Sequence, residues 1–253
     1  MNKRLLIPIP SLGFDPSETA IPWKLLKERS IEIVFATPDG KMGKADVRML
    51  NGEKLGPLKK LLIARNDAIN AYLEMEQSKE FQHPIAYSDI SEAAFDAILL
   101  PGGHDKSVRP YLESEILQQV VVDFFRKNKP VAAVCHGVVL AARSKYPETG
   151  KSVLFGYKTT SLLEQQELLA YRLTKWWTDD YYLTYPGLTV EHEVKSVLQS
   201  QEDFKCGPKP ILRDDPNHLE RGFVCSDRNY LSARWPGDIY SFSNALFQLI
   251  TKN

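Results

Sequence analysis

The chain of 253 residues has little of three features that often reveal a protein's class: cysteine, net charge and long apolar runs. It has 3 cysteines, Cys135, Cys206 and Cys225, and their spacing fits neither a disulfide framework nor a metal-binding pair. An odd number of cysteines without a pattern is typical of a reducing compartment. We therefore expect a cytoplasmic protein without disulfides.

Charge of one sign is not in excess either. Lys and Arg together number 32, as do Asp and Glu, so the formal net charge is zero. This balance offers no electrostatic footprint for nucleic acid or for an anionic membrane, and we expect neither partner. It also does little to oppose self-association, and we expect a homodimer.

No segment is apolar enough to span a membrane. Residues 1–4 are followed by a short apolar run that Pro8 and Pro10 interrupt. That run is too short for a signal peptide, so it is interpreted as the first strand.

The sequence does contain an alternation of short apolar runs with helical patterns. Tyr111–Lys127 carries an apolar face at helical spacing, and Pro22–Glu28 is a shorter helical pattern. Four apolar runs suit strands that are buried on both faces: Leu5–Ile9, Ile31–Ala36, Ala97–Leu100 and Val131–Val134. The alternation predicts an α/β fold, a flavodoxin-like, doubly wound and mostly parallel sheet with helices on both faces.

We expect one domain, residues 1–253, with two segments added to this frame. The first, near 51–84, carries a charged helix at Leu58–Gln77 and is interpreted as a small cap. The second, near 159–219, is aromatic-rich between Trp176 and Tyr185. A hairpin of Gly222–Cys225 with Tyr230–Ala233 is expected next, and then a last helix capped by Asp238.

The most informative segment runs from Val131 to Gly137, where a buried strand leads into Cys135, His136 and Gly137 and then an apolar helix. This pattern is typical of a nucleophile elbow, in which a strained turn lifts the side chain above the sheet. The N-terminus of the following helix should favour the thiolate of Cys135. The alternative for any cysteine is a buried, inert thiol, which we accept for Cys206 and Cys225.

Two further segments follow strands at the same edge of the expected sheet. Gly103 and His104 come after one strand, where backbone N–H groups could stabilise an oxyanion, although an ordinary turn would read the same way. Glu18 comes after the first strand and could reach Cys135, with a pKa raised by burial. Glu18 could equally be an exposed residue of a helix cap with Asp15.

Together these three segments resemble the ThiJ/PfpI superfamily, which has the class I glutamine amidotransferase-like fold, and within it the heat-inducible chaperone and glutathione-independent glyoxalase branch. The resemblance implies Cys135 as nucleophile, His136 as its partner and Glu18 as the acidic neighbour. It implies a further acid that orients His136, Glu164 or Glu167, of which Glu164 is preferred. The remaining pocket residues that we expect to converge on the cysteine are Trp23, Gly103, His104, Arg234 and Pro236.

Asp105, which stands where the glyoxalase branch has glycine, and the Trp176–Tyr185 segment depart from the family pattern. The resemblance implies an enzyme of small reactive carbonyls, converting methylglyoxal to lactate, or a related deglycase. One alternative is a cysteine amidase or peptidase, which needs a wide cleft and an acid behind His136; another is a thiol sensor or holdase chaperone. No cofactor is expected. No metal is expected either, because the zinc site of some chaperone relatives does not map onto His83, His104, His192 or His218.

Overall fold

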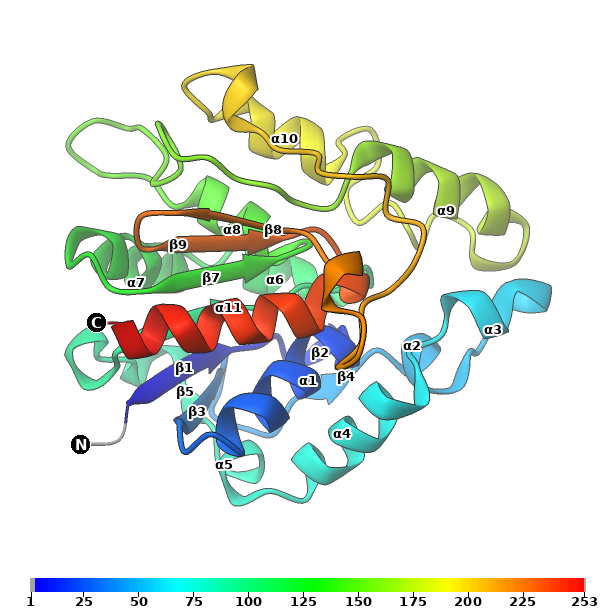
Figure 1. Cartoon of the computed structure of the whole chain (residues 1–253), viewed down its shortest axis with the longest axis horizontal. Helices are drawn as coiled ribbons and strands as arrows, with labels where there is room; N and C mark the ends of the chain where they lie inside the picture. The colour runs from blue at the N-terminus through cyan, green and yellow to red at the C-terminus, as the bar shows by residue number, and fades with distance from the viewer. Residues whose placement is uncertain (1–2, 253) are drawn as a thin grey trace.

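The computed structural model describes residues 3–252, which form a seven-stranded sheet between layers of helices (Figure 1). The strand order is β5-β3-β1-β6-β7-β9-β8, and every neighbouring pair is parallel except β8 with β9. This confirms the predicted doubly wound, mostly parallel fold. The strands are β1 Arg4–Pro8, β3 Glu32–Thr37, β5 Ile85–Ala86, β6 Ala97–Leu100, β7 Val131–Val134, β8 Val224–Asp227 and β9 Tyr230–Ala233, with β2 Leu12–Phe14 and β4 Lys44–Ala45 in a separate pair.

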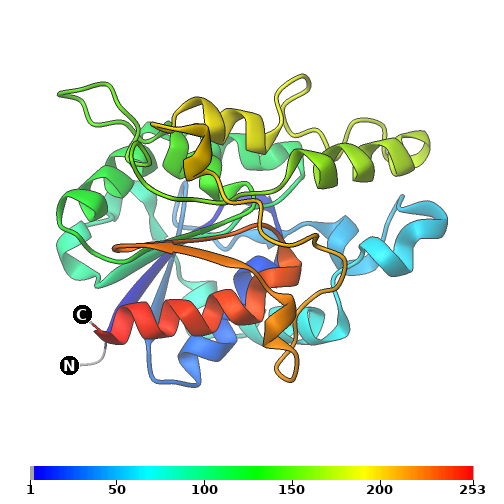
Figure 2. The same cartoon turned by 45° about the horizontal axis from the view of Figure 1, so that its top comes forward.

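Helices cover both faces of the sheet. On one face α1 (Pro16–Lys27) packs against α11 (Ile239–Lys252) and α4 (Asn66–Glu76). On the other, α7 (Glu115–Arg126) and α8 (Gly137–Arg143) pack on β6 and β7, and α10 lies over α8 (Figure 2). The other helices are α2 Val47–Asn51, α3 Lys59–Leu62, α5 Lys79–Gln82, α6 Arg109–Leu112, α9 Glu164–Thr178 and α10 Val190–Ser196.

Two of the helices differ from the sequence prediction. The predicted helix Pro22–Glu28 is the second half of α1, which begins at Pro16 because Asp15 accepts hydrogen bonds from the first free N–H groups and proline is tolerated in the first turn. The predicted helix Tyr111–Lys127 is broken at Ser114, whose hydroxyl caps α7. The break turns Ile116, expected in the core, out to solvent.

The last helix does begin after Asp238, but the side chain of Asp238 does not cap it. Asp238 is buried and binds Arg234 and the N–H of Phe223. Asp214, from a distant loop, accepts hydrogen bonds from the Tyr240 and Ser241 N–H groups instead. The expected hairpin is confirmed as the antiparallel pair β8–β9.

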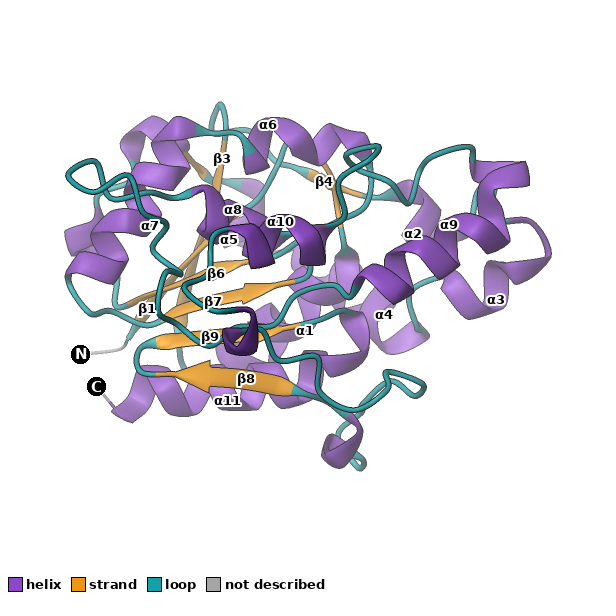
Figure 3. Ribbon diagram, turned by 90° about the horizontal axis from the view of Figure 1, so that it is seen from above, coloured by secondary structure: helices purple, strands orange, loops and turns teal. Residues whose placement is uncertain are grey.

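Parts of the two added segments, around α3 and α9, lie side by side beyond the sheet edge (Figure 3). The charged helix expected at Leu58–Gln77 is two helices, α3 and α4, and α4 packs on α1 rather than forming a cap. Residues 46–63 do contact the second added segment. Met49 and Leu55 form a small hydrophobic cluster with Tyr181 and Tyr182 of that segment, separate from the main core.

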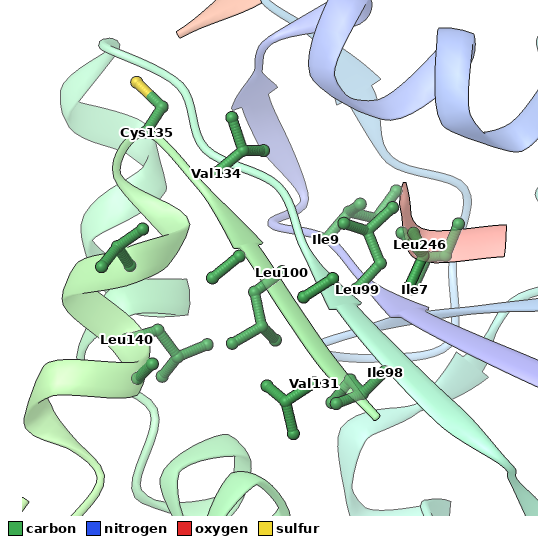
Figure 4. Packing of buried hydrophobic residues seen from close by; sticks show 14 of the residues in the cluster. Ile7, Ile9, Ile98, Leu99, Leu100, Val131, Val134, Cys135, Leu140 and Leu246 are labelled. Atoms are coloured by element: carbon green, nitrogen blue, oxygen red, sulfur yellow. The ribbon is translucent and has the colours of Figure 1, made fainter. Parts of the chain in front are cut away.

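The centre of the sheet forms a rigid platform. Residues of β6 and β7 are buried on both faces, and Ile98 lies beside Val131 (Figure 4). Because β1, β6 and β7 are parallel, their carboxyl ends meet at one edge, and ligand sites of such sheets lie at that edge. Within residues 3–252, no helix has the length and apolar character to cross a membrane.

Candidate active site

Cys135 occupies a strained turn between β7 and α8, as the elbow pattern predicts. Its φ is 56°, in the left-handed region that non-glycine residues rarely adopt. Its N–H donates to the Ala233 carbonyl, which holds the turn against β9. The sulfur projects beyond the end of the strand, away from the packed side chains of the core (Figure 4).

Two glycines allow the neighbouring loops to approach this turn. A Cβ on Gly102 would lie 2.7 Å from the N atom of His136 and 2.9 Å from Oε2 of Glu18. A Cβ on Gly137 would lie 2.0 Å from the carbonyl oxygen of Leu100. Both distances are shorter than real side chains permit, so glycine is required where the loops after β6 and β7 meet.

Glu18 lies in the first turn of α1 and is fully buried, so the solvent-exposed alternative is wrong. Its Oε2 accepts a hydrogen bond of 2.9 Å from the Gly102 N–H. Its Oε1 makes no geometrically good hydrogen bond within residues 3–252, although the carboxyl interacts with the thiol of Cys135. Burial, and next the charge of Asp15, raise the pKa of Glu18 well above its usual value.

The pKa of the Cys135 thiol is raised, whereas the sequence predicted that it is lowered. Burial raises its pKa, and the negative charges of Glu18 and Asp15 raise it further; the His136 N–H lowers it by less. The expectation that the pKa of this thiol is lowered in favour of the thiolate is therefore wrong in direction. Since two buried acids in contact do not both ionise readily, a charged Glu18 keeps Cys135 protonated, and the thiol then needs a base.

His136 stands next to the sulfur and can be that base. Its Nδ1 lies 3.4 Å from the sulfur of Cys135, and its Nε2 lies 2.9 Å from Oγ1 of Thr184. The imidazole is fully buried, and burial lowers its pKa well below the usual value, followed by the effects of His104 and Arg143. The neutral ring therefore predominates near pH 7.

Neither of the two acids proposed to orient His136 contacts it in the described chain. Glu164 is exposed at the start of α9. Glu167 is buried, accepts a hydrogen bond from the Val190 N–H, and has a pKa raised by burial to about 7. The prediction for Glu164 is wrong because its side chain is exposed, and Thr184, from the loop after α9, occupies the place behind His136.

A roof of aromatic side chains closes the site. The ring of His104 lies 5.0 Å from that of His136 and 5.0 Å from that of Tyr182. Tyr181 packs edge-to-face against Tyr182 and donates a hydrogen bond to Asp46, the N-cap of α2. Cys135 beside these rings is only 1% exposed, so its sulfur is shielded from solvent.

The remaining expected pocket residues are placed unequally. Gly103 faces the backbone of Gly13 and Phe14, and it is the preceding Gly102 that adjoins the cysteine. Trp23 is buried in α1 and donates to Glu80. Arg234 is fully buried in an ion pair with Asp238, so it has a structural position rather than a place at the sulfur. Pro236 lines a separate cavity of about 10 Å³ next to Arg213.

Sequence reasoning missed Thr184, Tyr182 and Asp46 as individual members of the site. The only sequence signal for them was the aromatic character of the segment 176–185. Within that segment Trp176 is 80% exposed and so does not line the buried site. In the described part of the chain, no three His, Cys, Asp or Glu side chains gather as a metal site would require.

Comparison with known proteins gives relatives of the same kind. The chain is 27% identical to the glutathione-independent glyoxalase hsp3102 of Schizosaccharomyces pombe over 152 residues, 59% of each chain. It is 30% identical to an uncharacterised protein of the same yeast over 123 residues, 48% of this chain and 45% of that one. The chain thus spans about half the length of the curated relatives that it matches.

Among solved structures, glyoxalase III from Candida albicans superimposes with a TM-score of 0.72 at 16% identity, covering 99% of this chain and 98% of that one. The 24 kDa Rapid Encystment Protein of Francisella tularensis gives 0.71 at 16% identity, covering 98% and 99%. These likenesses support the fold. The profile described as ThiJ/PfpI family-like matches residues 9–208, most of the sequence, and the chain therefore belongs to the ThiJ/PfpI family.

Proposed function

We propose that the protein is a cysteine-dependent enzyme of small reactive carbonyls, converting an α-oxoaldehyde such as methylglyoxal to a 2-hydroxy acid. The observation that carries the proposal is that the buried imidazole of His136 has its Nδ1 3.4 Å from the sulfur of Cys135. The buried carboxyl of Glu18 raises the pKa of the same thiol and is held by the Gly102 N–H of the loop that meets the elbow. Matches to a glutathione-independent glyoxalase and to a glyoxalase III fold agree with it.

The reaction begins with sulfur adding to the aldehyde carbon. The S–C bond forms, the carbonyl electron pair moves to oxygen, and the thiol proton reaches that oxygen through His136. The Glu18 carboxylate then removes the hydrogen from the same carbon and returns a proton to the neighbouring one, through an enediol. The product is a thioester on Cys135, and water hydrolyses it to the hydroxy acid and the free thiol. No external oxidant or reductant is needed.

The structure gives less support to an amidase or peptidase. Such an enzyme stabilises the imidazolium with an acid and admits a peptide, whereas Thr184 stands behind His136 and the sulfur is covered. A holdase role draws on a different feature: Leu169, Leu173 and Trp176 are exposed at helical spacing on α9.

The test is an assay of the purified protein against α-oxoaldehydes, chromogenic amides and an aggregating client protein. We expect turnover of an α-oxoaldehyde that Cys135→Ser abolishes and the matched control Cys206→Ser retains. Turnover of amides alone would favour the hydrolase. Suppression of aggregation that survives Cys135→Ser, without any turnover, would favour the holdase.

A further inference from the structure

The hydroxyl of Thr184 touches two groups whose hydrogen-bonding roles together fix the proton on His136. Thr184 Oγ1 lies 2.8 Å from the backbone oxygen of His104, which can only accept. The single hydroxyl proton is therefore donated to His104. At 2.9 Å from Nε2 of His136, the Thr184 oxygen must then accept, so Nε2 carries the imidazole proton.

We propose that Thr184 is a positioning residue that holds His136 in the Nε2–H tautomer, so that Nδ1 presents a lone pair to the sulfur of Cys135. The separation of 3.4 Å between Nδ1 and the sulfur suits a hydrogen bond from the thiol. In the opposite tautomer, Nδ1–H would point at the thiol and could not take its proton. Thr184 therefore decides whether the imidazole beside Cys135 is a base.

This inference rests on the proposed function for its chemical step. When sulfur attacks a carbonyl carbon, the S–H bond breaks and its proton moves to Nδ1, giving a transient imidazolium. The electron pair of the broken carbonyl π bond goes to oxygen, and Nδ1–H returns the proton there. Glu18 stays a carboxylate throughout, ready for the following proton abstraction. The Thr184 oxygen accepts from Nε2–H in both the neutral and the charged ring.

Thr184 belongs to a covering segment, residues 180–185, that is held from several sides. Arg109 donates to the Thr184 backbone oxygen, and Asp180 forms an ion pair with Lys106 at 2.5 Å. Tyr185 donates to Glu113 and accepts from Arg143 of α8.

These contacts hold Thr184 where its Oγ1 meets both the His104 backbone oxygen and Nε2 of His136. In this arrangement Cys135 is 1% exposed.

Nitrogen-15 NMR of the protein labelled at histidine tests the tautomer directly, because a protonated and an unprotonated imidazole nitrogen have well-separated shifts. The five histidines allow assignment of His136 through His136→Asn. We expect the wild type to show Nε2 protonated and Nδ1 unprotonated. Thr184→Val should mix the two tautomers, and Thr184→Ser, which keeps the hydroxyl, should match the wild type.

The second measurement is alkylation of Cys135 by iodoacetamide near pH 7. With the rate divided by the extent of local opening, which amide hydrogen exchange of residues 180–185 measures, Thr184→Val should slow alkylation about fivefold to tenfold, because it loses the one hydrogen bond that selects the base form, while Thr184→Ser should not. A wild-type His136 protonated at Nδ1, or a folded Thr184→Val with unchanged tautomer, would overturn the proposal. Neither readout involves a carbonyl substrate, so a protein that turns over none would refute the proposed function and leave this result separate.

Discussion

The carboxyl group of Glu18 and the thiol of Cys135 interact where neither reaches solvent, and the charge of one raises the pKa of the other. Oε2 of Glu18 is occupied by the Gly102 N–H, so a proton on this carboxyl resides preferentially on Oε1. The pair can therefore hold one negative charge readily but not two. When Glu18 carries this charge as the base, Cys135 is a neutral thiol, so its proton must leave through another group before or during the attack of the sulfur.

The first prediction concerns Glu18→Gln. The amide oxygen can still accept from Gly102, but the neutral group cannot remove a proton, so α-oxoaldehyde turnover should fall at least about a hundredfold. Removal of the negative charge should also lower the pKa of Cys135, so its alkylation should begin at lower pH than in the wild type. Mass spectrometry of labelling across pH, with turnover measured in parallel, checks both. An unchanged turnover would remove Glu18 from the chemistry.

The pH dependence of turnover follows from the same pair. Since burial raises the pKa of Glu18 well above its usual value, the carboxylate that acts as base forms only at correspondingly higher pH. Turnover should rise with pH through that raised pKa, and this limb should vanish in Glu18→Gln. A rate that is level from pH 5 upward would contradict the assignment.

A second prediction uses the closed roof over Cys135. Cys206 is exposed and serves as an internal reference. A bulky maleimide should label Cys135 at least about tenfold more slowly than Cys206, because labelling must wait for local opening. Tyr181→Phe, which removes the hydrogen bond to Asp46, should speed labelling of Cys135 about fivefold and leave Cys206 unchanged. Equal labelling of the two cysteines in the wild type would show that the roof does not cover the sulfur in solution.

The parts of the site that local sequence encodes could be predicted, and the parts that depend on long connections could not. The elbow at Cys135 was predictable because an apolar strand, small residues and a helix are consecutive. Glu18 remained ambiguous because a capping glutamate and a buried acid have the same sequence context. Thr184 lies in an insertion whose path is set by contacts with Arg109 and Asp46, which are distant in the sequence. Hydrophobic periodicity does not predict contacts of this kind.

The same reason explains the error at Arg234 and Asp238. Pro236, Gly237 and Asp238 form a good local signal for a helix start, so Asp238 was assigned to the cap. A distant residue, Asp214, took that place, which left Asp238 free to pair with Arg234 inside the protein. Capping preferences alone cannot tell which of two aspartates reaches the helix.

This pairing gives the third prediction. Arg234→Met leaves Asp238 buried without its partner, which should reduce the free energy of unfolding by roughly 3–5 kcal/mol. The control Arg221→Met breaks a partly exposed ion pair with Asp215 and should cost about 1 kcal/mol or less. Urea unfolding of both variants measures the difference. Because the Arg234 side chain bonds Asp238 and the backbone of Cys206 and Pro208, and no catalytic side chain of the described residues, turnover per folded molecule should persist at a pH where Glu18 is ionised. A specific loss of turnover with normal stability would return Arg234 to the pocket.

The fourth prediction concerns Glu167, whose pKa is raised from about 4.5 in the unfolded chain to about 7 by burial. Between these values the unfolded state loses its proton while the folded state keeps it, so this contribution to stability is complete below pH 4.5 and is lost as pH rises to 7. Glu167→Gln is neutral throughout and can still accept from the Val190 N–H.

Relative to the wild type, Glu167→Gln should therefore gain roughly 2–3 kcal/mol between pH 4.5 and pH 8. Urea unfolding at the two pH values measures the gain, and comparison with the wild type cancels the titration of every other group. The control Glu164→Gln changes an exposed carboxyl in the same helical turn and should run nearly parallel to the wild type. If Glu167→Gln also runs parallel, folding leaves the pKa of Glu167 at its ordinary value, and the expected effect of burial on this carboxyl is contradicted.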